Sequence, residues 1–183
     1  IMLVLALSRG WSVPLIGLAD LHAAWGLGGW GGILLAAMAY VVVPMFQLTP
    51  GYPARASWWY PMLMFAALLL CSLALWLASD SLGRLGYLAL NASGLGFSGL
   101  TLRLQRQRRR GRPDTTSRYW QLGLVGSILA LAMASTAAIW PPLGEWSGWP
   151  LLFGVLLIGG GYLSFIIGML YKIVPFLGWL HLQ

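Results

Sequence analysis

The sequence predicts an all-α fold, a bundle of about five transmembrane helices, and three observations support this prediction. Hydrophobic residues make up 59% of the 183-residue chain and charged residues only 8%, whereas soluble domains average about 45–50% and about 25%. A single cysteine excludes a disulfide framework. One span uses about 20 residues, so the apolar residues suffice for about five spans. We therefore expect one transmembrane domain over 1–183, with the lipid bilayer as its main partner.

Apolar runs with at most one charged residue each place these spans along the chain. The first and last runs are long, and each holds a Val-Pro pair near its end, where a helix kinks or stops because proline lacks an amide donor. Residues 1–7 are apolar but too short to span. Since the chain lacks a starting Met and stops just after a predicted helix, we expect an internal piece of a longer protein. The predicted spans are 18–46, 58–78, 82–102, 120–140 and 150–176.

The loop 103–118, between the third and fourth predicted spans, is strongly basic. It holds seven of the eleven Lys and Arg residues. Short Lys/Arg-rich loops stay cytoplasmic, so we expect this loop inside and the first, third and fifth spans to run from outside to inside. The cluster is read mainly as a topology signal, although it would also attract anionic lipid headgroups. Nucleic acid is not an expected partner, because the basic run lies between two membrane helices.

The first and last spans share a weak internal similarity at a constant offset of 131 residues. Biased membrane composition also produces such matches, so the similarity suggests, without proving a duplication, that the two spans are alike. The matching pairs are Gly28 and Gly159, Gly29 and Gly160, Met38 and Met169, Tyr40 and Tyr171, Val43 and Val174, and Pro44 and Pro175.

His22 is the strongest candidate for a cofactor or metal ligand. It lies near the outer end of the first span, and on an α-helix Gly26 (i+4) and Gly29 (i+7) would share its face and leave that face without side chains. A cleared face beneath an imidazole suits a haem whose iron the histidine coordinates. The alternative is an interfacial or hydrogen-bonded His22, with glycines that pack against a neighbouring helix.

Other polar residues offer less. His181 reads as an interface residue and Cys71 as a small packing residue. Asn91 begins a glycosylation sequon that sits at membrane depth, so we expect it to make an interhelical hydrogen bond instead. Since no span holds a pair of carboxylates and no serine has a convincing His/acid partner set, we assign no catalytic residue and leave enzymatic activity open.

Residues 18–70 resemble the second and third helices of the large subunit of haem-copper oxidases. The resemblance rests on His22, the glycine-rich stretch after it, and the segments 40–46, 50–53 and 55–59. It implies that His22 is an axial ligand of a low-spin haem, with Gly26 and Gly29 shaping the pocket, and that residues 1–7 end a first helix. The family's second helix runs from outside to inside, as the arginine loop independently predicts for the first span.

The chain also departs from that family. Its sixth helix would carry a copper ligand, but no histidine lies between residues 149 and 172, and the chain has two histidines in all. A complete oxygen-reducing centre is therefore not expected in this segment, and copper binding stays open. The sequence looks more like divergent oxidase-like bacterial proteins of the NnrS type. These imply a haem-binding inner-membrane protein in electron transfer or respiratory and nitric oxide metabolism, with an electron-transfer partner or a homo-oligomer. The alternative is a transporter or an assembly or structural subunit without a cofactor.

Overall fold

The computed structural model describes residues 8, 14–109, 112 and 114–182. Every regular element within these ranges is helical, and they contain no strand. This confirms the all-α prediction. The apolar residues 1–7, expected to end a preceding helix, lie outside the described residues.

The first long element of the described residues is a continuous helix of 33 residues, Leu15–Gln47. It starts as α2 (Leu15–Ala23), widens into the π-helical segment η1 (Ala24–Gly32), and continues as α3 (Ile33–Gln47). Pro44 lies inside α3, and the helix ends at Gln47, where the next residue, Leu48, takes a left-handed conformation with φ 53. The Val-Pro pair therefore stands close to a real helix end.

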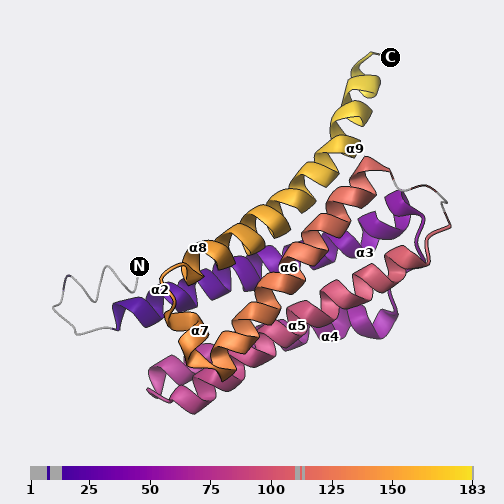
Figure 1. Cartoon of the computed structure of the whole chain (residues 1–183). Helices are drawn as coiled ribbons and strands as arrows, with labels where there is room; N and C mark the ends of the chain where they lie inside the picture. The colour runs from indigo at the N-terminus through magenta and orange to yellow at the C-terminus, as the bar shows by residue number, and fades with distance from the viewer. Residues whose placement is uncertain (1–7, 9–13, 110–111, 113, 183) are drawn as a thin grey trace.

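Three antiparallel helices follow, and they coincide with the second, third and fourth predicted spans (Figure 1). They are α4 (Ala54–Trp76), α5 (Asp80–Arg106) and α6 (Thr115–Ile139). α5 packs between α4 and α6. The carboxylate of Asp114 caps α6 by accepting a hydrogen bond from the Ser117 amide at 2.9 Å.

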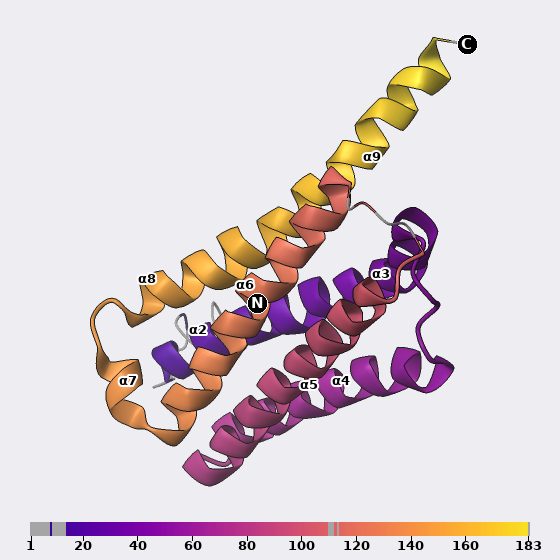
Figure 2. The same ribbon diagram turned by 45° about the vertical axis from the view of Figure 1, so that its right-hand side comes forward.

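A short helix α7 (Pro141–Glu145) leads to a second continuous helix of 33 residues. This helix consists of α8 (Trp149–Gly154), the π-helical segment η2 (Val155–Leu163) and α9 (Ser164–His181). Pro175 does not stop it, because α9 continues to His181. The end of α9 projects beyond the neighbouring helices in both views (Figures 1 and 2).

The sequence similarity between the first and last spans has a counterpart in the backbone. Adding 131 to the bounds of η1 (Ala24–Gly32) gives 155–163, which are the bounds of η2 (Val155–Leu163). Both segments have nine residues and are continuous with α-helix on either side. The two long helices are therefore similar elements, as their matching glycines, tyrosines and prolines suggest.

Four of the long helices are long and apolar enough to cross a membrane. Five spans were predicted, and four of them are confirmed as helices of this kind. The exception is α5, the helix at the expected third span. α5 lies between α4 and α6 and buries polar side chains, including Asn91, Ser98 and Gln105, where lipid does not reach them. Large side chains elsewhere, such as Trp30 (75% exposed) and Trp76 (84% exposed), face outward as lipid-contacting residues do.

The packed core lies between the first helix, α5, α6 and α9. Ala36, Ala39 and Val43 of α3 are fully buried and form a cluster that includes Phe97 and Trp120. The small alanines let the first helix approach closely, which is how membrane helices gain packing contacts.

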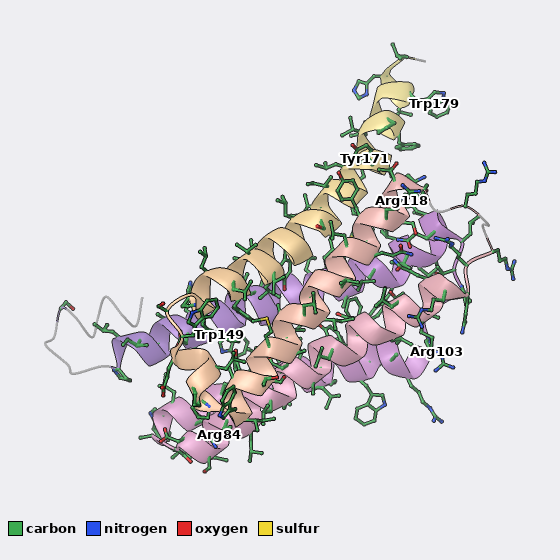
Figure 3. The ribbon with its side chains drawn as sticks, in the orientation of Figure 1. Arg84, Arg103, Arg118, Trp149, Tyr171 and Trp179 are labelled. Atoms are coloured by element: carbon green, nitrogen blue, oxygen red, sulfur yellow. The ribbon has the colours of Figure 1, made fainter. Side chains whose placement is uncertain are left out.

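The basic loop is shorter than predicted. α5 runs to Arg106 and α6 begins at Thr115, so the connection covers only 107–114. Arg103 and Arg118 therefore stand on helices, but they still gather at one end of the bundle, opposite Arg84 and Trp149 (Figure 3). Most of the positive charge of the described residues therefore lies at this end of the bundle, as predicted.

Candidate functional site

The structure keeps only part of the predicted haem face. His22, in the last turn of α2, is exposed, and so is Gly26, where an added Cβ would meet nothing within 4 Å. Gly29 is buried, and its Cβ would lie 3.0 Å from the Leu68 side chain and 3.3 Å from Trp25. The wider turns of η1 hold more residues than the 3.6 of an α-helix, so they rotate Gly29 away from the face of His22.

What remains is an open face made by His22 and Gly26. Within the part of the chain that the structure describes, the His22 imidazole has no hydrogen-bond partner and belongs to no group of three metal-ligating side chains. A flat group lying over Gly26 could reach the imidazole from outside the described bundle. His22 and Gly26 thus form an open face, whereas Gly29 acts in helix packing.

The second histidine lies far from the first. His181 is exposed at the end of α9, with its Nδ1 2.9 Å from the carbonyl oxygen of Leu177. The end of α9 and α2 lie at opposite ends of the molecule (Figure 1). The two histidines therefore do not share a metal within this chain.

A cavity of about 780 Å³ lies between the two long helices and α4, α5 and α6. Both π-helical segments contribute to its wall, and most lining side chains are apolar. His22, Gly26 and Gly29 do not line it. The polar lining residues are Asp20, Tyr60, Tyr87, Asn91, Ser98, Ser127 and Tyr162.

Tyr162 of η2 joins the two π-helical segments across this cavity. Its hydroxyl donates a hydrogen bond to the carbonyl oxygen of Leu27 at 2.5 Å. Its ring lies over Gly31, where a Cβ would be 3.3 Å from the ring carbon Cε1. The missing side chain at Gly31 is what allows this approach, so the glycines of η1 position the cavity wall.

Asn91 of α5 is the most unusual polar group in the lining. The residue is only 2% exposed, and its side chain interacts with the Tyr87 hydroxyl one turn earlier on the same helix, although Nδ2 makes no hydrogen bond of full geometry. The interhelical hydrogen bond expected for Nδ2 is therefore not made. The sequence pointed to Asn91 but not to the cavity beside it. The similarity between the two long helices was the one feature of the sequence that could have indicated it.

Polar contacts hold the basic end together and leave no comparable open site. Gln105 Nε2 donates to Gln47 Oε1 at 2.9 Å, and the hydroxyls of Tyr52 and Thr101 are 2.9 Å apart. Burial raises the pKa of the Tyr52 hydroxyl, so this group stays protonated. These contacts fasten the 48–53 connection to α5.

Comparison with known proteins gives no relative from which a function could be inferred, so the function must be argued from the residues of this chain. No family model, no curated protein and no solved structure matches this sequence.

Proposed function

We propose that this chain is part of a haem-binding membrane protein of haem-copper-oxidase-like kind, with His22 as one axial ligand, in a bacterial inner membrane. Its role would be electron transfer or respiratory and nitric oxide metabolism. The observation that carries the proposal is the exposed, unpartnered imidazole of His22 beside open space at Gly26. The sequence resemblance of residues 18–70 supports it.

The roles of this chain's residues follow from their positions. A bound haem would supply one-electron chemistry. His22 would offer a ring nitrogen to the iron, and Gly26 would leave room for the edge of the macrocycle. Packing of Gly29 against Leu68 would hold the helix, and with it the imidazole, in place. Any second protein ligand for the iron would come from outside the described residues, because His181 stands at the end of α9, at the opposite end of the molecule from α2 (Figure 1).

The optical spectrum of the protein purified from membranes tests this proposal. We expect a Soret band in the unchanged protein and in His181→Ala, but not in His22→Ala. Gly26→Leu, which would fill the open face, should lower the haem content while the helical circular dichroism stays the same. A protein without a Soret band, or a His22→Ala protein that keeps it, would show that haem is not bound here.

A transporter is the second candidate, and one observation favours it. Two matched helices that depart from α-helical geometry face a common cavity, as the interrupted helices of repeat-built transporters do. A membrane-impermeant maleimide can test it on Ser98→Cys, a cavity position, in a Cys71→Ala background. Transport by alternating access requires labelling from both sides of the membrane, whereas labelling from one side only would exclude it.

We also propose that the basic segment 103–118 faces the cytoplasm and that its arginines contact anionic headgroups. The basis is the exposed Arg103, Arg106 and Arg118 at this end. Gln107→Cys in a Cys71→Ala background should react with an impermeant maleimide only when the cytoplasmic side is accessible. Labelling in intact spheroplasts would show that this end of the bundle faces the periplasm instead, opposite to the proposed orientation.

A further inference from the structure

We propose that the cavity between η1 and η2 is a water-filled vestibule, which opens to the aqueous phase at the Asp20 end of the bundle and attracts cations at its mouth. It brings water to the hydroxyls of Ser98 and Ser127, deep in the bundle. Three features carry this inference: the position of the exposed lining residues, the hydroxyls that make no hydrogen bond within the protein, and the carboxylate at the mouth. The vestibule is separate from the face of His22 and does not depend on haem.

The mouth of the cavity lies at one end of the bundle. The same end carries Arg84 and Trp149, opposite Arg103 and Arg118 (Figure 3). Charged side chains such as Asp80 and Arg84 are exposed there, and exposed charges belong outside the hydrocarbon layer. The cavity therefore opens where water is. The exposed lining residues come from α2, α7 and the start of α8, and they are Ile16, Asp20, Ala23, Gly144 and Pro150.

Packed side chains close the cavity toward the arginine end. The rings of Phe97 and Phe165 form part of its wall, and both belong to the buried core cluster. Beyond them, the Tyr52 ring stacks on Phe97 with the centroids 6.4 Å apart, and Gln105 donates a hydrogen bond to Gln47. Neither Tyr52 nor the glutamine pair lines the cavity. The structure therefore holds a vestibule with one mouth rather than a continuous channel.

Two serines in the cavity wall have hydroxyls without a partner. Elsewhere on α5 and α6, the hydroxyls of Ser93, Thr101 and Ser135 each donate to a carbonyl four residues earlier, and these residues do not line the cavity. Ser98 of α5 and Ser127 of α6 do line it, and within the part of the chain that the structure describes neither makes a hydrogen bond. Neither oxygen is among the enclosed polar atoms that lack a partner, so both stay open to the cavity.

Water is the partner that fits these hydroxyls. A hydroxyl both donates and accepts, as water does. The Tyr60 hydroxyl, 3.3 Å from where a Cβ of Gly32 would lie, likewise has no hydrogen bond to the described residues. The cavity volume of about 780 Å³ is ample for water, which takes about 30 Å³ per molecule in the liquid. Lipid tails offer no hydrogen bond, so they would leave all three hydroxyls unpaired.

Asp20 gives the mouth its charge. It is the one charged residue among the described lining residues, and it is exposed. It also interacts electrostatically with the Tyr87 hydroxyl of the cavity wall, so its carboxylate belongs to the mouth. A carboxylate at the entrance of a cleft with low-dielectric walls raises the local concentration of cations and lowers that of anions. Small cations should therefore enter more readily than small anions.

Thiol labelling in the membrane tests the water path. In a Cys71→Ala background, Ser98→Cys and Ser127→Cys are treated with a cationic and an anionic methanethiosulfonate of similar size, in spheroplasts and in inside-out vesicles. These reagents react with the thiolate, which forms in water but not in apolar surroundings. Ser81→Cys, exposed at the start of α5, shows which preparation presents the Asp20 end. We expect both cavity positions to react from that side.

Ala92→Cys is the matched control on α5. Ala92 is exposed, does not line the cavity and lies nearer the Asp20 end than Ser98. A lipid-facing thiol at this position should react about tenfold more slowly than Ser98→Cys, because its thiolate is disfavoured. Asp20→Asn should lower the preference of Ser98→Cys for the cationic reagent about threefold. Ser81→Cys, outside the cavity, should keep its reactivity.

No reaction at either cavity position, or an equal reaction at Ala92→Cys, would overturn the vestibule. Reaction of the cavity positions from the arginine side alone would do the same. If Asp20→Asn kept the full preference for the cationic reagent, Asp20 would not attract cations at the mouth. Reaction from both sides would support the vestibule as one state of an alternating-access transporter.

Discussion

The first and last long helices have the same plan but different surroundings. Each has 33 residues, and each carries a nine-residue π-helical segment at matching positions, 131 residues apart. One face of the second half of the first helix is buried along its whole length, from Ala36 to Gln47, with Val43 fully covered. Its counterpart α9 is buried only near its start, at Phe165 and Gly168, whereas its end projects from the bundle and Val174 is 59% exposed (Figure 2).

Side-chain size accounts for much of this difference. Ala36 and Ala39 are fully buried in the cluster with Phe97, whereas the positions 131 residues later hold Ile167 and Leu170. Leu170 is 47% exposed. Small residues permit close helix contact, and branched residues at the same places direct the helix surface toward lipid. The glycine-rich segments thus account for the π-helical backbone that both helices share. The residues after these segments determine how closely each helix packs in the bundle.

The largest expected effect comes from separating the last helix from α6. A Cβ at Gly126 would lie 2.7 Å from the backbone carbon of Gly160 in η2. Because the obstacle is backbone, neither helix can relieve the clash by a rotamer change. Gly126→Val should lower the free energy of unfolding by about 3 kcal/mol, in the range of overpacked sites. Thermal unfolding in detergent, followed by circular dichroism, measures this change.

Gly159→Ala is the control on the facing helix, because an added Cβ there meets nothing within 4 Å. Its melting midpoint should stay close to that of the unchanged protein. If both variants were equally stable, η2 would not be held against α6 as the structure has it.

The next effect concerns the contact between the two π-helical segments. Tyr162→Phe removes the hydroxyl that bonds the Leu27 carbonyl while it keeps the ring over Gly31. We expect a loss of about 1 kcal/mol, the usual contribution of one hydrogen bond. Tyr171→Phe, at a tyrosine that is 53% exposed, should have no effect in the same unfolding measurement. Equal losses in the two variants would contradict a special link at Tyr162.

Much of the fold follows from the sequence, and particular residues show where the prediction fails. Long apolar runs predicted helices, and each predicted span coincides with a long helix. The third, α5, is not among the helices apolar enough to span a membrane, because it carries polar residues such as Asn91 and Ser98, which pack against the neighbouring helices. The 107–114 connection is shorter than predicted because charged residues such as Arg103 and Arg106 continue α5.

The candidate sites were harder to predict. The α-helical spacing placed Gly29 beneath His22, but the π-helical turns that begin at Ala24 move it into packing against Leu68. A wide turn depends on the glycines of both segments together with tertiary contacts such as Tyr162 to Leu27, which join residues 135 positions apart. Local periodicity does not contain that information.

The smallest expected effect concerns the ion pair that fastens α9 to the start of α6. Lys172 Nζ lies 2.9 Å from Asp114 Oδ2, and both side chains are partly exposed, at 32% and 21%. Partly exposed ion pairs contribute about 0.2–1 kcal/mol, because water and salt screen them. Lys172→Met should therefore lower the melting midpoint only slightly, and raising the salt concentration should shrink the difference from the unchanged protein. Arg118→Met, at an exposed arginine in the first turns of α6, serves as the comparison.

Since Asp114 also caps α6 through the Ser117 amide, Asp114→Ala should cost more than Lys172→Met. An equal cost for the two variants would mean that the cap adds nothing beyond the ion pair.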